Sequence, residues 1–218
     1  MHLQKVHFNM IKLMQKLPRS VTVAFSGGVD SCAAVDFLSR NHQVYCAFFN
    51  HGTETSRKAE EFAIEFCDKR DIDFTIGYPC EAKQSDQSWE EYWRLERYRF
   101  LHGINGTVVT AHHLDDCVET YVFNMLHGKQ QTIPFANRNV VRPFLTTPKS
   151  ELVSWCQRHS VPWIEDESNL DISFMRNYIR HKLLPKALLV NPGLQKVVKK
   201  FVEEEYSDMQ HMIAYLRN

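Results

Sequence analysis

Short runs of β-branched and aromatic residues alternate with longer stretches of helical periodicity through the first half of the chain. We interpret four of these runs as strands, at residues 21–25, 44–49, 73–78 and 107–111. Helical patterns fall between the strands or after the last of them, at residues 33–39, 57–70, 89–102 and 114–127. Short apolar strands separated by helices are what a parallel sheet covered on both faces requires. The sequence therefore predicts an α/β fold with a doubly wound parallel sheet.

The second half of the chain is predicted to be mostly helical. Residues 128–144 have no helical period and are expected to form an irregular excursion or a small hairpin, and three helices are expected beyond them, at residues 149–159, 171–184 and 194–216. At 218 residues the chain has room for one α/β domain and a short appendage. We expect the domain to span residues 1–185 and a helical C-terminal appendage to span residues 186–218.

Composition argues against several classes of protein. No apolar run approaches the roughly 18 residues that a membrane span needs, so a soluble cytoplasmic protein without a membrane partner is expected. The six cysteines include no C-x-x-C pair, which argues against zinc or an iron–sulfur cluster and favours free thiols. Because the formal net charge is zero, any contact with nucleic acid must use a local basic patch.

The strongest local signal is SGGVDS, residues 26–31, which directly follows the first predicted strand. Gly27 and Gly28 allow the backbone to curl and present N–H groups to phosphate oxygens, and the following helix N-terminus adds positive partial charge. No lysine follows the glycines, so this is not a Walker A loop, and SGGVDS is also not the G-x-G-x-x-G dinucleotide pattern. The alternative is a glycine turn joined to a helix cap, which would need no function.

A second cluster of polar residues follows the fourth predicted strand, in the sequence AHHLDDCVET. It contains His112, His113, Asp115, Asp116 and Glu119, and a first helical turn there places two carboxylates in one pocket. Such a cluster is suited to a cation, either Mg²⁺ or an ammonium group. The alternative is that these acidic residues complement the helix dipole. Because parallel strands end at a common edge, we expect this cluster to lie beside SGGVDS.

SGGVDS resembles the PP-loop of the ATP pyrophosphatases, which share an adenine nucleotide alpha hydrolase-like fold. In that family the loop holds the pyrophosphate of ATP, and the α-phosphate is attacked to give an adenylate. The resemblance implies that Asp30 is catalytic and positions Mg²⁺, a hard cation suited to a carboxylate and phosphate oxygens. It also implies that ATP is bound by Ser26, Gly27, Gly28, Val29, Asp30 and Ser31.

AHHLDDCVET resembles the HHxDDxxET motif of the tRNA(Ile)-lysidine synthetases, which typically have Gln at the position of Cys117. In that family, carboxylates of this motif recognise the amino group of free lysine. The resemblance implies that Asp116 and Glu119 bind lysine and that His112 is catalytic and lies near the reacting ATP.

Three other stretches resemble the same family in the same order. NHG, residues 50–52, follows the second strand, and the family's R-x-x-R-Y pattern falls on Arg94, Arg97 and Tyr98. An arginine there can neutralise charge on a pentavalent α-phosphate, and we assign Arg94 as catalytic, although an amphipathic helix with two solvated arginines would show the same pattern. The third stretch matches the family pattern at Arg142, Pro143, Lys149, Asp166, Ser168, Asn169, Arg176, Asn177, Arg180 and Pro185.

The cationic helix end in this third stretch is expected to contact substrate. Its basic side chains can meet the carboxylate of lysine or the phosphates of tRNA. We assign Arg176 to lysine and Arg180 and Lys182 to tRNA.

Together these resemblances imply a ligase that uses ATP and Mg²⁺. It would adenylate the wobble cytidine in the anticodon loop of tRNA(Ile), release pyrophosphate, and let the amine of free L-lysine displace AMP to form lysidine. A single-stranded loop is a suitable target because its bases can be splayed into a pocket. Two alternatives remain open: another PP-loop tRNA modifier such as a thiolase, and a non-catalytic module that binds ATP or tRNA.

Overall fold

The computed structural model describes residues 11–165 and 171–216, and within them it has one six-stranded sheet with the strand order β3-β2-β1-β4-β6-β5. Four neighbouring pairs are parallel, and β5 and β6 pair in antiparallel fashion. The doubly wound α/β prediction is therefore confirmed. The strands are β1 (Ser20–Phe25), β2 (Gln43–Phe49), β3 (Phe74–Gly77), β4 (Val108–Val109), β5 (Ala136–Asn137) and β6 (Val140–Val141).

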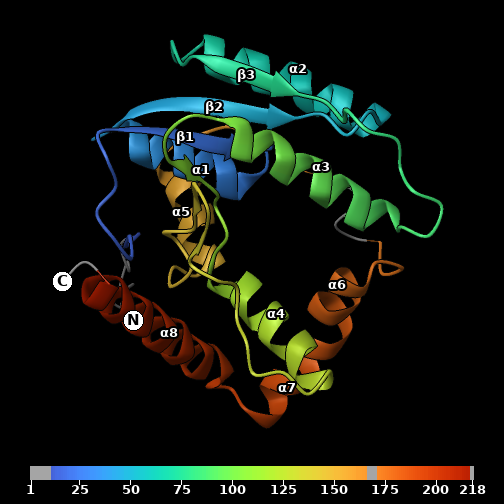
Figure 1. Ribbon diagram of the computed structural model, residues 1–218, viewed down its shortest axis with the longest axis vertical. Helices are drawn as coiled ribbons and strands as arrows, with labels where there is room; N and C mark the ends of the chain where they lie inside the picture. The colour runs from blue at the N-terminus through green and yellow to red at the C-terminus, as the bar shows by residue number, and fades with distance from the viewer. Residues whose placement is uncertain (1–10, 166–170, 217–218) are drawn as a thin grey trace, which may run out of the picture.

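Helices cover both faces of this sheet because side chains alternate along its central strands. Val23 and Cys46 enter the larger core, to which α1 (Val29–Ser39), α2 (Glu54–Asp68) and α5 (Lys149–His159) also contribute. Ala24 and Ala47 face the other way, into a smaller cluster with α3 (Trp89–Gly103). Figure 1 shows α1 and α5 on one side of β1 and α3 passing in front of the sheet.

The remaining helices lie together away from the main sheet (Figure 1). They are α4 (Leu114–Leu126), α6 (Met175–Tyr178), α7 (Leu184–Val190) and α8 (Leu194–Leu216), with a π-helical turn, η2 (Ile179–Leu183), between α6 and α7. Apolar side chains of α4 and α8 form a third buried cluster, which includes Cys117, Val118, Val198 and Val202. The C-terminal helix therefore packs on the helix that carries the carboxylate motif.

Several boundaries differ from the sequence predictions. The helix predicted at residues 171–184 starts only at Met175, since Asp171 uses its side chain and carbonyl to bond Ser173 and Asn177 in a turn. Two residues, Val108 and Val109, form the fourth strand, while residues 128–144 do contain the small hairpin, β5 and β6. Helix α2 starts at Glu54 because Thr53 accepts a hydrogen bond from the Ser56 N–H and caps it.

The sheet order brings the two polar motifs together. The strand order reverses between β1 and β4, which are hydrogen-bonded neighbours, and open α/β sheets bind ligands at such a switch point, beyond the carboxyl ends of the strands. SGGVDS follows β1 and the HHLDD sequence follows β4. The fold therefore places both motifs beyond the carboxyl ends of the two neighbouring strands β1 and β4.

Two further predictions concern the chain as a whole. None of the helices in residues 11–165 and 171–216 is long and apolar enough to cross a membrane. All six cysteines are free thiols, of which five are buried and Cys80 is exposed.

Candidate active site

The glycine turn after β1 depends on Gly27. Its φ of +80° lies in the left-handed region, and a Cβ added there would come within 3.0 Å of Cδ1 of Phe62 and 3.1 Å of Cδ1 of Ile164. The Gly27 carbonyl also accepts a hydrogen bond from the Ile164 N–H at 2.9 Å. The packed chain at Ile164 thus holds this turn in its curled shape.

Hydrogen bonds of Ser26 and Ser31, on either side of the turn, fix its backbone conformation. The Ser31 hydroxyl donates to the Gly28 carbonyl at 2.9 Å and accepts from the Ser26 N–H at 3.2 Å. Gly28 is the N-cap of α1 and supplies no side-chain cap. The first N–H groups of α1 therefore have no side-chain cap, and their positive partial charge is available to an external anion.

Asp30, in the first turn of α1, has one carboxylate oxygen that accepts no hydrogen bond within the described chain. Oδ2 lies 3.5 Å from Nε2 of His113 and 3.9 Å from Nζ of Lys149, whereas Oδ1 is buried and has no hydrogen-bond partner within the described chain. A buried carboxylate oxygen without a donor is costly unless a ligand satisfies it. Asp30 is therefore suited to a cation or a protonated group at the phosphate turn.

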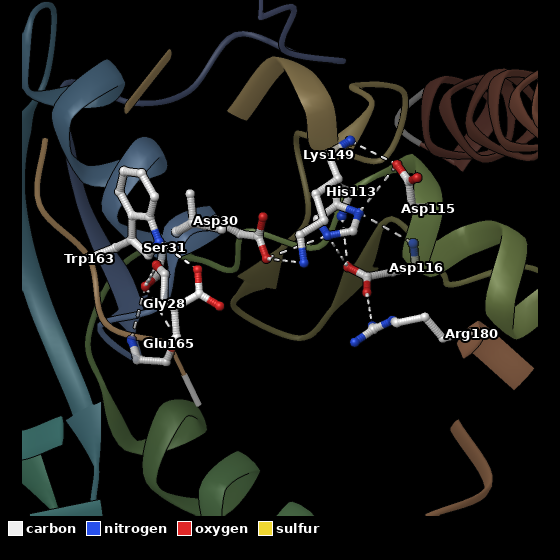
Figure 2. A network of polar contacts seen from close by, with 12 residues as sticks. Gly28, Asp30, Ser31, His113, Asp115, Asp116, Lys149, Trp163, Glu165 and Arg180 are labelled. Carbon is white, nitrogen blue, oxygen red and sulfur yellow. Dashed lines mark hydrogen bonds and ion pairs between the residues drawn. The ribbon is translucent and has the colours of Figure 1, made fainter. Parts of the chain in front are cut away.

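His113 connects the phosphate turn to the carboxylates (Figure 2). It caps α4: its Nδ1 accepts a hydrogen bond from the Asp116 N–H at 3.3 Å, and Oδ2 of Asp116 accepts one from the His113 N–H at 3.0 Å. This capping bond assigns the ring proton to Nε2, which lies 3.5 Å from both Asp30 and Asp116. Burial lowers the pKa of His113, but the Asp116 and Asp30 carboxylates outweigh it and raise the pKa.

His112 differs from its neighbour in charge. Its Nδ1 lies 2.8 Å from the Thr110 hydroxyl, and burial lowers the pKa of His112 to about 3, against the pull of Asp116 and with a contribution from three arginines, Arg142, Arg176 and Arg97. The imidazole is therefore neutral at physiological pH. A neutral imidazole can accept or donate a hydrogen bond without adding charge.

The two carboxylates assigned to lysine are both buried and both paired. Glu119 accepts hydrogen bonds from Arg176 Nε at 3.1 Å and from Arg180 Nε at 2.6 Å, and Asp116 accepts one from Arg176 Nη2 at 2.9 Å. Burial raises the pKa of Asp116, but His113 and Arg176 hold that pKa well below its usual range. The structure thus brings Asp116, Glu119, Arg176 and Arg180 into one charged cluster.

Asp115 serves the fold rather than this cluster. Its Oδ2 accepts a hydrogen bond from the Lys149 N–H at 2.8 Å, at the start of α5, and its Oδ1 accepts one from Gln195 Nε2 at 3.1 Å, near the start of α8. The first turn of α4 therefore uses two of its acidic residues differently. Asp115 ties helices together and Asp116 faces the site.

The other assigned cations are spread around the cluster. Arg94 is exposed on α3, with its guanidinium carbon 5.0 Å from the centre of the Tyr98 ring. Lys182 is exposed on η2, while Arg180 turns inward to Glu119. Asp166, Ser168 and Asn169 lie outside the described residues.

Sequence reasoning placed His113 in the polar cluster and Lys149 in the family pattern, but it assigned neither of them a role in the site. The signal for His113 was present, because it precedes Asp116 by three residues, the spacing of a reciprocal cap. Histidine is not among the usual capping residues, so the pattern was missed. No local pattern relates Lys149 to Asp30, which lies more than a hundred residues earlier.

Comparison with known proteins identifies the family of this chain. Residues 3–187 match the family described as the PP-loop domain. The chain belongs to the PP-loop family. The SGGVDS segment, residues 26–31, follows β1 and extends into the first turn of α1.

Curated proteins named tRNA(Ile)-lysidine synthase resemble this PP-loop protein over most of its length. One from Thermosipho africanus is 32% identical over 84% of this chain and 47% of its own length, and one from Legionella pneumophila (strain Paris) is 32% identical over 81% and 44%. Another, from Pseudothermotoga lettingae, is 28% identical over 96% of this chain and 51% of its own length. The chain spans about half the length of the curated relatives it matches.

Proposed function

We propose that this PP-loop protein is an ATP-dependent ligase that forms a carbon–nitrogen bond in tRNA. It adenylates the wobble cytidine of tRNA(Ile), joins free L-lysine to it as lysidine, and releases AMP and pyrophosphate. One observation carries the proposal: the PP-loop lies close to the buried carboxylates of α4, because Nε2 of His113 lies 3.5 Å from both Asp30 and Asp116. The names of the similar curated proteins supply the reaction and the RNA substrate.

ATP binding follows from the PP-loop. Ser26, Gly27, Gly28, Val29, Asp30 and Ser31 would surround the β- and γ-phosphates with backbone N–H groups and hydroxyls. Mg²⁺ fits the donor set of Asp30, whose buried Oδ1 is unsatisfied. Within the described chain no cluster of three or more His, Cys, Asp or Glu side chains is suited to a metal, so phosphate oxygens and water would complete its coordination. When bound, the metal would supply positive charge to the phosphates.

Lysine binding requires an exchange of partners in the charged cluster. The ammonium of lysine would take the place of a guanidinium beside Asp116 and Glu119, and Arg176, once released, would bind the carboxylate of the same lysine. Lysine carries one carboxylate and two amino groups: its carboxylate would offset the ammonium bound beside Asp116 and Glu119, and the other amine, as the nucleophile, would be neutral. Arg176 is suited to move because its side chain is 41% exposed.

Catalysis would rest on three side chains that surround the reacting phosphate. Asp30 would position the metal, neutral His112 would donate or accept a hydrogen bond near the α-phosphate, and Arg94 would neutralise negative charge in the transition state. Exposed Arg94 can reach a ligand by rotating its side chain, since its cation–π contact with Tyr98 is a weak restraint.

The tRNA would approach over the π-helical turn. Lys182 is exposed there, and Arg180 would contact a phosphate only after leaving Glu119. We also propose that residues 1–185 form the catalytic domain and residues 186–218 an appendage, whose helix α8 supports α4. In the curated relatives, the length that this chain does not match would be available for further RNA contacts.

Product analysis tests the ligase proposal. The protein is incubated with ATP, Mg²⁺, lysine and bulk tRNA, and the nucleotide products are separated. We expect AMP and pyrophosphate in equal amounts, dependent on both lysine and tRNA. ADP and orthophosphate as main products would contradict adenylation.

A further inference from the structure

Four aromatic side chains form a continuous row of ring contacts, which we call the aromatic row: Phe49, His51, Trp93 and Trp89. The ring centres are 5.1 Å apart for Phe49 and His51, 5.5 Å for His51 and Trp93, and 5.3 Å for Trp93 and Trp89. Along the row the angle between neighbouring rings falls from 74° to 59° and then to 32°. The outermost two rings therefore come closest to a parallel stack.

The exposure of the aromatic row increases towards α3. Phe49 is 6% exposed, His51 and Trp93 are half-buried, and Trp89 is 57% exposed. Figure 1 shows that α3 begins to the right of the sheet, where the loop from β3 reaches it. Single exposed apolar side chains are normal in proteins, but here a continuous row of rings ends in solvent. The row thus presents an open aromatic surface.

Trp89 is held in place although it is exposed. The ring of Tyr92 packs against it edge-on, with ring centres 5.8 Å apart and an interplanar angle of 75°. The Tyr92 hydroxyl in turn donates a hydrogen bond to the Glu81 carbonyl at 2.7 Å, and Nζ of Lys83 lies 5.4 Å from the centre of the Trp89 ring. A ring that is already restrained loses little conformational freedom when a ligand stacks on it.

The inner end of the aromatic row lies at the edge of the sheet that carries SGGVDS. Strands β1 and β2 are parallel, and their register pairs Phe25 with Phe48. Phe49 therefore ends β2 at the level where Ser26 begins the glycine turn after β1, and His51 follows two residues later. The row leads from this edge out to solvent.

We propose that Trp89 and Trp93 bind an unpaired nucleobase of the RNA substrate by stacking. A base is a flat ring that would extend the aromatic row, and unpaired bases of RNA loops stack on aromatic side chains in this way. The inference rests on the proposed function, which supplies a single-stranded anticodon loop. The stacked base would be a neighbour of the reacting nucleotide, because the reacting base must reach the SGGVDS edge while Trp89 lies in solvent.

The charges beside Trp89 give the bound strand a direction. The Lys83 ammonium lies close to the ring and can bind a phosphate next to the stacked base. Glu90 and Glu91, exposed in the first turn of α3, would repel a phosphate. The sugar–phosphate backbone would therefore pass on the Lys83 side of the ring.

RNA binding by Trp89→Leu tests the inference, because Leu keeps an apolar side chain but removes the ring. Three probes are titrated into the full chain at fixed salt: a labelled single-stranded oligocytidine, an oligomer of the same length whose sugars carry no bases, and ATP. Tyr215→Leu is the matched control, since it removes an aromatic side chain that is 82% exposed on α8. Circular dichroism and thermal melts check that each variant is folded.

We expect Trp89→Leu to weaken oligocytidine binding by about fivefold or more relative to Tyr215→Leu, as the loss of one stacked base implies. Trp89→Phe, which keeps a smaller ring, should weaken it by a smaller factor. The base-free oligomer and ATP should bind equally well to Trp89→Leu and Tyr215→Leu.

The inference is overturned if folded Trp89→Leu binds oligocytidine as Tyr215→Leu does, or if it loses the base-free oligomer by the same factor. Weaker ATP binding by Trp89→Leu would assign the surface to the adenine of ATP and would also contradict it, as would a wild-type chain that does not bind oligocytidine. Because these titrations need neither lysine nor turnover, they are independent of the ligase assay. Lysidine formation could fail while the RNA surface stands, or succeed while it falls.

Discussion

Glu119→Gln tests whether the charged cluster stabilises the fold. Glu119 is 3% exposed and accepts three hydrogen bonds from Arg176 and Arg180. Gln has nearly the same shape but is neutral, so the change removes the charge with little change in volume and leaves Asp116 as the carboxylate that still faces Arg176 and Arg180.

The size of the effect follows from the exposure of the arginines. Breaking a fully buried ion pair costs about 3–5 kcal/mol. The Arg176 and Arg180 side chains are 41% and 25% exposed, so water can partly compensate them. We therefore expect the free energy of unfolding to fall by roughly 2–3 kcal/mol, a drop in Tm of about 4–12 °C for a protein of this size.

Chemical denaturation and thermal melts measure this loss. The matched control is Glu203→Gln, which removes an exposed carboxylate 3.9 Å from Lys199 on α8 and should cost less than about 0.5 kcal/mol. If Glu119→Gln were no more destabilising than this control, the cluster would not contribute to stability as the geometry implies.

Three further predictions concern the PP-loop and the histidine beside it. Asp30→Asn should abolish AMP release while leaving the melting temperature within a few degrees of wild type, as assays of nucleotide products and thermal melts will show. Gly27→Ala should lower the free energy of unfolding by about 1–3 kcal/mol, because φ is +80° and the new Cβ lies 3.0 Å from Phe62. The control Gly28→Ala should cost less, because its new Cβ lies 3.6 Å from Ser26 Oγ. Equal losses for the two variants in denaturant titrations would contradict this packing argument. His112 has a pKa near 3 when folded and about 6.5 when unfolded, so below pH 6.5 the unfolded chain binds the extra proton and stability falls as pH is lowered towards 3. His112→Gln should therefore flatten the stability profile over that window by up to about 1.4 kcal/mol per pH unit, and an unchanged slope would contradict the lowered pKa.

Local pattern was enough to locate the PP-loop and the carboxylate motif. Both follow short strands rich in β-branched or aromatic residues, and the parallel arrangement of those strands determines that the two motifs share an edge. The hairpin at residues 136–141 could be predicted as one of two possibilities, because residues 128–144 lack any helical period.

The pairing within the site could not be predicted from sequence. Glu119 meets Arg176 and Arg180 across 57 and 61 residues, and nothing in the local pattern shows that basic residues of a later helix turn inward. The same holds for Arg142, whose buried hydrogen bond to the Tyr98 hydroxyl joins positions 44 residues apart.

Side-chain competition explains the misjudged helix near residue 171. Apolar spacing favoured a continuous helix, but Asp171 bonds the Ser173 N–H in a tight turn. The helix then begins at Met175 and passes through a π-helical turn at Ile179. Periodicity does not report either feature.

Mass analysis of nucleosides tests the central claim most directly. Bulk tRNA is incubated with the protein, ATP, Mg²⁺ and isotopically labelled lysine, digested, and compared with a matched reaction of Asp30→Asn. The account predicts a labelled nucleoside with the mass of cytidine plus lysine minus water, present with the wild-type chain and absent with Asp30→Asn. A wild-type reaction that consumes ATP to AMP without forming the labelled nucleoside, or that forms a sulfur-containing nucleoside instead, would contradict it.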